Sequence, residues 1–147
     1  ESAAGGLISS ALLSVPGASA YYLGGTVVYT IAASKALLAG AVEAPKGLRG
    51  ATEEFARYQA QAIRGRLGTT WGTGETGATG PTPNRYGDPA GHGWLAIAGP
   101  LAGGNEDTTY VTRHVLTGLE DRVANMAVFA AGALRLFLET LEATSKT

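Results

Sequence analysis

The sequence predicts an α/β protein, namely a three-layer α/β/α sandwich with a mixed parallel and antiparallel sheet. Segments with helical spacing of apolar residues alternate with short runs rich in β-branched and aromatic residues. The last three predicted strands follow one another with no helix between them, which argues against a purely parallel sheet. The 147 residues have the length of one domain, so residues 1–147 are assigned to a single domain.

The first half of the chain contributes one predicted strand. Residues 20–30, AYYLGGTVVYT, form an aromatic and β-branched run that predicts a strand. The pair Gly24-Gly25 in its middle indicates a bulge or a place where a ligand approaches the backbone. The predicted helices of this half cover residues 5–14, 32–38 and 53–67, and Thr52 caps the last of them while Gly68 ends it.

The second half contributes three consecutive strands and a long helix. The strands are predicted over residues 69–75, 92–98 and 108–117, with a turn at residues 101–107. A loop rich in Gly and Pro covers residues 76–91, and loops of that length inside a domain are usually functional. The last helix is predicted over residues 119–141. Its predicted inward side chains are Val123, Ala127, Ala130, Leu134, Phe137 and Leu141.

Composition excludes several classes of function. The net charge is −1, so the chain lacks the basic character of a protein that binds nucleic acid or an anionic membrane surface. Cysteine is absent, which excludes disulfides and thiolate chemistry. His92 and His114 lack the spacing of metal ligands, so we expect neither a metal nor another cofactor.

The chain shows no sequence signal for secretion or membrane insertion. The longest apolar run, residues 126–138, is interrupted by Arg135 and falls short of the ~20 residues that a crossing needs. The first residues lack the basic flank of a signal peptide. We therefore expect a cytoplasmic protein without a membrane span.

The opening ESAAGGL has two readings. Ser2 is either a helix cap or a nucleophile at the mouth of a helix end. Gly5 and Gly6 would let a ligand approach the helix start, where free N–H groups favour an anion or a developing oxyanion.

A nucleophilic serine needs a base, and no histidine stands in a triad arrangement. The candidates are Lys35 and Tyr29. A lysine acts as a base only where burial or a neighbouring cation lowers its pKa. By residue type alone, a solvated lysine and a core tyrosine are the commoner situations, and the spacing does not settle whether the two side chains converge.

The loop at residues 76–91 does not carry a known nucleotide motif. It lacks the Gly-Lys-Ser/Thr ending of a phosphate-binding loop, and Pro81 and Pro83 are incompatible with a dinucleotide-binding helix start. This loop is either a Gly-rich wall of a pocket or an ordinary surface loop, and the sequence favours neither interpretation.

Five stretches in order resemble the C-terminal domain of the competence-damage-inducible CinA proteins, the nicotinamide-nucleotide amidases. They are ESAAGGLIS, VPGASAYYLGGTVVYT, SKALLAG, TGATGP and DPAGHGW, which together cover most of residues 1–98. The resemblance implies hydrolysis of the carboxamide of nicotinamide mononucleotide to nicotinate mononucleotide and ammonia, without a metal. It also implies a homo-oligomer, which the apolar, Gly-rich composition favours. Family members carry a helix and a strand before the first motif, and the given sequence does not contain them.

The resemblance assigns roles to residues of this chain. It implies Ser2 as the nucleophile, Lys35 as the base and Tyr29 as the residue that relays or orients the proton. The residues that it implies in substrate or oxyanion binding are Gly5, Gly6, Ser19, Gly24, Gly25, Thr76 and Gly77.

The chain departs from the family pattern at several positions. Ala3-Ala4 replace Cys-Thr, Ile31 replaces an Asn, and Lys35 lies one residue further from Tyr29 than usual. Ala124-Asn125 stand where the last helix often carries an Arg. The open alternatives are an amidase for another small amide and a degenerate member that binds a nucleotide or serves as an assembly subunit.

Overall fold

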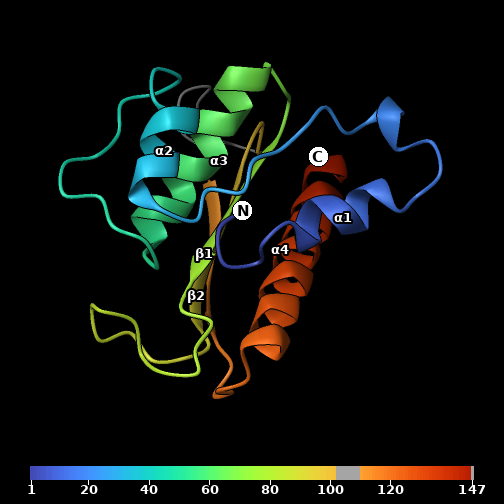
Figure 1. Ribbon diagram of the computed structural model, residues 1–147. Helices are drawn as coiled ribbons and strands as arrows, with labels where there is room; N and C mark the ends of the chain where they lie inside the picture. The colour runs from blue at the N-terminus through green and yellow to red at the C-terminus, as the bar shows by residue number, and fades with distance from the viewer. Residues whose placement is uncertain (102–109, 147) are drawn as a thin grey trace.

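The structure is a computed structural model that describes residues 1–101 and 110–146. Figure 1 shows α2 and α3 on one side of the strands and α1 and α4 on the other, which confirms the α/β class. In chain order the elements are α1 (Leu7–Leu13), the 3-10 helix η1 (Ala18–Ala20), α2 (Ile31–Leu38), α3 (Glu53–Leu67), β1 (Gly72–Gly77), β2 (His92–Ala98), β3 (Tyr110–Leu116) and α4 (Arg122–Ser145).

The sheet is antiparallel, so the prediction of a mixed sheet is wrong for the strands that the structure describes. Its order is β1-β2-β3, with Glu75 opposite Leu95 and Trp94 opposite His114. Each strand pairs with the next strand in sequence, as in a meander, and no helix crosses over between them. The predicted turn at residues 101–107 lies outside the described residues except for Leu101.

The predicted strand at residues 20–30 is wrong. After η1 the chain runs extended, but in the described part of the molecule its backbone pairs only with Glu1. The amino group of Glu1 donates to the Thr26 carbonyl at 3.0 Å, and the Val28 N–H donates to the Glu1 carbonyl at 2.9 Å. The residue types do favour an extended backbone, but a strand also needs a neighbour along its length.

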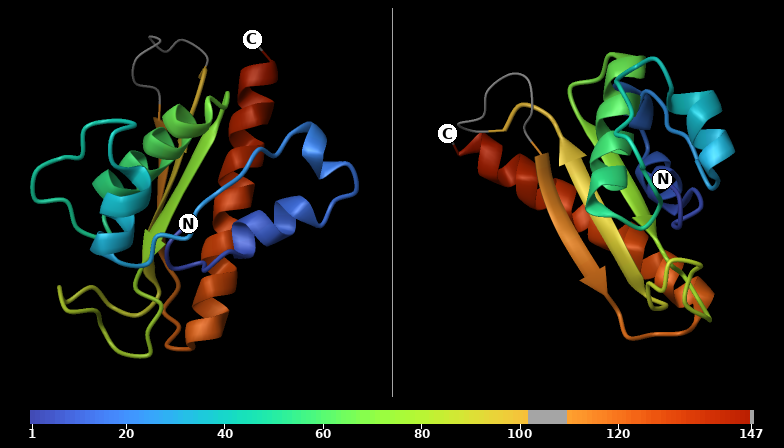
Figure 2. Two further views of the ribbon diagram at one scale, coloured as in Figure 1. Left: turned by 45° about the horizontal axis from the view of Figure 1, so that its top comes forward. Right: turned by 90° about the vertical axis from the view of Figure 1, so that its left-hand side faces the viewer.

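Small residues bring α3 close to the sheet. A Cβ atom on Gly72 would lie 2.1 Å from the Ala60 carbonyl oxygen, and one on Gly74 would lie 1.9 Å from the Ala56 carbonyl oxygen. Helix α3 therefore packs backbone to backbone on β1, with Ala56 and Ala60 buried against the alanines of β2. Figure 2 shows α3 and α4 on opposite sides of the twisted strands.

The other face of the sheet holds the largest apolar core. Leu95 and Ile97 project from β2 toward α4, because successive side chains of a strand point to opposite faces. They pack against Ala133 and Leu136 of α4 and against Ile8 of α1. This core places the start of α1, and with it residues 1–6, beside β1.

The inward face of α4 differs from the predicted stripe. Val123 is 74 % exposed, whereas Ala130 is buried and the predicted Leu134 and Phe137 are partly buried against the core. The buried residues are Asn125, Phe129, Ala130, Ala133, Leu136 and Thr140. The stripe was misplaced because two inward positions, Asn125 and Thr140, are polar and carry no hydrophobic signal.

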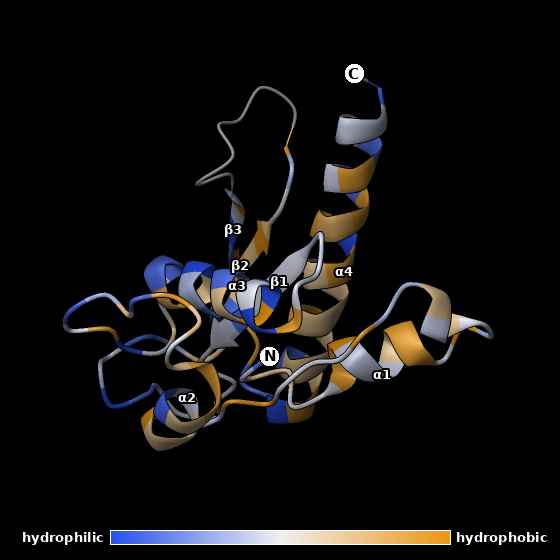
Figure 3. Cartoon of the chain, turned by 90° about the horizontal axis from the view of Figure 1, so that it is seen from above, coloured by the Kyte–Doolittle hydropathy of each residue, from blue (hydrophilic) through white to orange (hydrophobic). Residues whose placement is uncertain are grey.

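Helix α4 is long and apolar enough to cross a membrane by length and composition alone, contrary to the sequence expectation. This is a weak indication, since the core helices of soluble proteins meet the same criteria. Apolar residues recur along α4 (Figure 3), and some of them form the core with β2.

Candidate functional site

The turn that carries Ser2 is anchored to the sheet. The N–H groups of Ser2 and Ala4 both donate to one carboxylate oxygen of Glu75, each at 2.9 Å. The Ser2 carbonyl accepts from Gly5 N–H at 3.2 Å, which closes the turn. Ser2 itself is partly buried. Its backbone is thus held on both sides.

Ser2 is not the cap of α1, because the N-cap residue is Gly6. The carboxylate of Glu1 instead accepts from the N–H of Ile8 at 2.7 Å and of Ser9 at 3.0 Å. These amides at the helix start are therefore occupied by a side chain of the protein itself.

Gly5 and Gly6 are required by the backbone. Their φ angles are +63° and +102°, where residues with a side chain are strained. A Cβ on Gly5 would also meet the Met126 side chain of α4 at 3.0 Å. Their role as substrate-binding positions stays a prediction.

Glu75 is a buried carboxylate under this turn. It has no exposed surface, and burial raises its pKa, while the hydrogen bonds from Ala4 and Ser2 oppose that rise. Its second oxygen, Oε1, is buried without a partner among the described residues, as is Nε2 of Gln59. Gln59 Oε1 accepts from the Glu75 N–H at 3.1 Å.

Tyr29, Gly80 and Arg122 meet at one point although they lie far apart in sequence. Arg122, the first residue of α4, donates to the Tyr29 hydroxyl at 2.9 Å and to the Gly80 carbonyl at 2.8 Å. Tyr29 is 65 % exposed, so this contact lies at the surface. The Arg122 guanidinium thus links Tyr29, which the sequence proposes as a catalytic residue, to the Gly-rich loop.

Thr76 has a structural contact in this structure. It is buried, and its hydroxyl oxygen accepts from the Ala51 N–H at 2.9 Å. Ala51 has the unusual φ of +58°, and its carbonyl accepts from His92 Nε2 at 2.9 Å. The neighbouring Gly77 leaves room for Phe129, whose ring a Cβ would meet at 2.7 Å.

An ion pair joins the loop before α3 to the loop between β1 and β2. Arg49 Nη1 lies 2.7 Å from Asp88 Oδ2, and Asn84 donates to the same oxygen at 2.9 Å. The hydrogen bond from Arg49 is the main cause that holds the pKa of Asp88 below its ordinary value. The Arg49 guanidinium also lies 4.5 Å from the centre of the Tyr86 ring.

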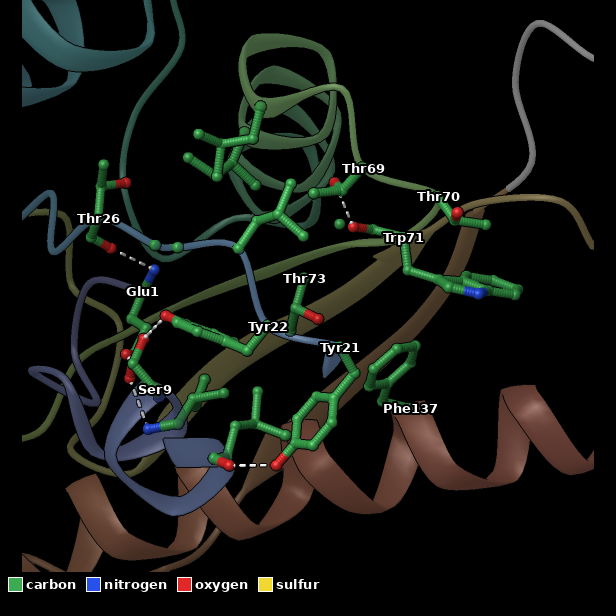
Figure 4. Close-up of a pocket in the computed structure, with 18 of the residues that line it drawn as sticks. Glu1, Ser9, Tyr21, Tyr22, Thr26, Thr69, Thr70, Trp71, Thr73 and Phe137 are labelled. Atoms are coloured by element: carbon green, nitrogen blue, oxygen red, sulfur yellow. Dashed lines mark hydrogen bonds between the residues drawn. The ribbon is translucent and has the colours of Figure 1, made fainter. Parts of the chain in front are cut away.

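A cavity of about 790 Å³ lies beside β1, between α3, α4 and the segment at residues 20–28 (Figure 4). Its wall is mainly apolar and includes Trp71, whose ring contacts Phe137 edge-on at 5.8 Å. Gly24 and Gly25 line it, and their role in binding a ligand stays a prediction. Ser2, Tyr29 and Lys35 are not among its lining residues.

Lys35 lies in a different place. It is exposed in the last turn of α2 and lines a hollow of about 740 Å³ with Ser34 and Tyr58. Neither Ser2 nor Tyr29 lines this hollow. Ser19, in η1, is also exposed and lies outside the lining of both hollows.

The arrangement holds the backbone of Ser2 in place and presents the cation of Arg122 at the surface. The backbone of Ser2 is fixed, and Arg122 with Tyr29 supplies hydrogen-bond donors and a positive charge suited to a phosphate or carboxylate. Among residues 1–101 and 110–146, no group of three or more His, Asp or Glu side chains is placed to hold a metal ion.

Sequence reasoning missed Glu75 and Arg122. It looked for a cation at Ala124-Asn125, although Arg122 directly follows the N-cap Asp121 and begins the helix. A glutamate inside the Gly- and Thr-rich strand β1 was a signal for Glu75, because a charged residue in a largely buried strand needs a partner. The ion pair between Arg49 and Asp88 was also missed, because no local sequence pattern indicates it.

Comparisons with known families agree along most of the chain. Residues 1–141 match the family model of the CinA C-terminal domain. A CinA-like protein of Salinibacter ruber is 39 % identical over 142 residues, which are 96 % of this chain and 32 % of that protein. One of Myxococcus xanthus is 32 % identical over 147 residues, which are all of this chain and 33 % of that protein. The chain therefore spans about one third of the length of these relatives.

Solved structures show the same fold. The competence damage-inducible protein A of Klebsiella pneumoniae superposes with a TM-score of 0.81 at 23 % identity, over 96 % of this chain and 83 % of that one. A CinA superfamily protein of Escherichia coli gives 0.79 at 23 % identity, over 93 % and 75 %.

Proposed function

Since this chain belongs to the family of CinA C-terminal domains, we propose that it hydrolyses the carboxamide of nicotinamide mononucleotide to nicotinate mononucleotide and ammonia. The observation that carries the proposal is the contact of Arg122 with Tyr29 and Gly80. It joins a residue implied in catalysis, the Gly-rich loop and a cation that suits the substrate phosphate. We also expect a homo-oligomer in the cytoplasm.

The reaction proceeds by acyl transfer. The Ser2 hydroxyl attacks the carboxamide carbon, and its proton passes to a base. The resemblance implies Lys35 as this base, although Ser2 does not line the hollow that Lys35 lines. The tetrahedral intermediate collapses with loss of ammonia, which takes up a proton as it leaves, and gives an ester on Ser2. Water then hydrolyses the ester. Donors near the oxyanion contribute about 3 kcal/mol each in such reactions.

Tyr29 and Arg122 act at the periphery of this reaction. The Tyr29 hydroxyl accepts from Arg122, so its own proton is free to point toward another acceptor. The guanidinium of Arg122 is exposed and binds the phosphate of the substrate. This replaces the cation that the sequence lacks at Ala124-Asn125.

The test is a substrate panel. Ammonia release is measured with nicotinamide mononucleotide, nicotinamide riboside and nicotinamide for the wild type and for Arg122→Gln, with Arg135→Gln of the same helix as a control. Wild type and control should prefer the mononucleotide. Arg122→Gln should lose about 10- to 100-fold in kcat/KM for the mononucleotide alone, as expected for one charge-assisted contact. Equal turnover of all three compounds contradicts a phosphate-recognising site.

A second candidate is a domain that binds the nucleotide without cleaving it. The separation of Lys35 from Ser2 favours this candidate, because the two residues line no common hollow. Binding of nicotinamide mononucleotide in calorimetry without ammonia release would support it. Ammonia release by the wild type together with full activity of Lys35→Ala would remove Lys35 from the mechanism and keep the amidase.

A further inference from the structure

We propose that Glu75 is the positioning residue of the site: its buried carboxylate holds the turn of residues 2–5 so that the Ser2 hydroxyl faces the substrate. The inference rests on the function proposed above, since it takes Ser2 as the nucleophile. Glu75 itself touches no reacting atom. It acts only through the backbone of the turn.

The geometry of the contact is that of an anchor. One oxygen, Oε2, accepts from the N–H groups of Ser2 and Ala4, each at 2.9 Å, so it spans the residue between them. The Gly5 N–H adds a third bond by donating to the Ser2 carbonyl at 3.2 Å. With its N–H and carbonyl both engaged, Ser2 keeps only the rotation of its side chain.

Packing also holds the turn of residues 2–5 in place. Ala3 and Ala4 are 7 % and 0 % exposed, and Ala4 belongs to the core with Ile8. The glutamate is fixed in turn, because Gln59 Oε1 accepts its backbone N–H at 3.1 Å. The turn therefore rests on β1 and on the core that α1, β2 and α4 form, rather than on the solvent-exposed surface.

A carboxylate is a costly choice at this position. Glu75 has no exposed surface, its Oε1 has no partner among the described residues, and burial raises its pKa. Its neighbours across the same face, Leu95 and Ile97, are apolar. If β1 needed only a packed side chain here, an apolar residue would be more stable. The two hydrogen bonds to the turn are what the carboxylate adds.

The experiment compares three variants by ammonia release from nicotinamide mononucleotide. Glu75→Gln keeps one acceptor oxygen for the two N–H groups. Glu75→Met has a similar volume and no such acceptor. Thr140→Val is the matched control, because it removes a buried side-chain hydrogen bond, the one to the Leu136 carbonyl within α4, and involves neither Glu75 nor the turn.

The expected result is a loss confined to the variant without the acceptor. In Glu75→Met, kcat should fall about 100-fold with KM changed less than about threefold, because a displaced nucleophile affects the chemical step more than binding. Glu75→Gln and Thr140→Val should both stay within about threefold of the wild type. The amide of Ala4 should exchange with solvent faster in Glu75→Met than in the other proteins.

Other outcomes would overturn either the positioning role of Glu75 or the proposed function. Wild-type kcat in Glu75→Met, or an equal loss in Thr140→Val, overturns the positioning role. If Glu75→Met does not fold, the kcat of Glu75→Gln is the test. A 100-fold loss of kcat in folded Glu75→Gln overturns the positioning role. A wild type that releases no ammonia overturns the proposed function instead. In that case unchanged exchange at Ala4 in Glu75→Met overturns the anchor as well.

Discussion

At the scale of single residues, Asp88 is a side chain whose charge contributes to stability. It accepts hydrogen bonds from Arg49 and Asn84, and the bond from Arg49 is the main cause that keeps its pKa below the ordinary 3.8. A carboxyl group with a lowered pKa in the folded state stabilises the fold above its ordinary pKa. That contribution disappears as the pH falls through the lowered value.

We therefore expect Asp88→Asn to lower the free energy of unfolding at pH 7 by about 1 kcal/mol, since Arg49 is partly exposed and water screens the pair. The difference from the wild type should shrink as the pH falls below 3.8. Urea unfolding between pH 7 and pH 3 measures it, with Glu142→Gln on the exposed face of α4 as a control. A difference that stays constant across this range contradicts the account.

At this scale the sequence located some residues of the site but not their partners. Ser2 and Tyr29 were proposed from motifs, and the structure places each in a defined contact, with Glu75 and Arg122 respectively. The partners lie 73 and 93 residues away in sequence. No local periodicity links residues that far apart, so only the fold could reveal them.

At the scale of the elements, the close packing of α3 on β1 depends on glycine. A Cβ on Gly74 would lie 1.9 Å from the Ala56 carbonyl oxygen, and backbone atoms cannot move aside as a flexible side chain can. Gly65, in α3, is different, because a Cβ there would meet nothing closer than 3.7 Å.

These two glycines should respond in opposite ways to alanine. Gly74→Ala should destabilise the protein by about 3 kcal/mol or more, because α3 must move away from the sheet. Gly65→Ala should stabilise it by up to about 1 kcal/mol, the usual gain of alanine over glycine inside a helix. Thermal unfolding checks both, and a neutral Gly74→Ala would mean that α3 and β1 lie further apart than described.

The elements were easier to predict than the sheet. Helix α3 lies where its capping residue Thr52 placed it, strand β2 has the predicted bounds, and β1 begins three residues later than expected. The strand prediction for residues 20–30 was wrong because their composition specifies an extended backbone but does not specify a neighbouring strand. The inward face of α4 was predicted incorrectly because Asn125 is buried although it is polar. Its side-chain amide donates to the loop carbonyls of Thr79 and Leu119.

At the scale of the whole molecule, the α/β class followed from the order of the elements, whereas the pairing of strands did not. The antiparallel meander brings residues 1–6, the loop at residues 78–91 and the start of α4 to the same region. This convergence brings the motifs that carry Ser2 and Gly80 to one region, whereas Lys35 lines a separate hollow and Ser19 lines neither hollow. The oligomeric state stays a prediction.

The central claim is that Ser2 is the nucleophile of an amidase. The most direct measurement is ammonia release from nicotinamide mononucleotide by the wild type, Ser2→Ala and the control Ser10→Ala, whose hydroxyl lies exposed on α1. The account predicts turnover by the wild type and by Ser10→Ala, and none above background by Ser2→Ala. Undiminished turnover by Ser2→Ala would contradict it.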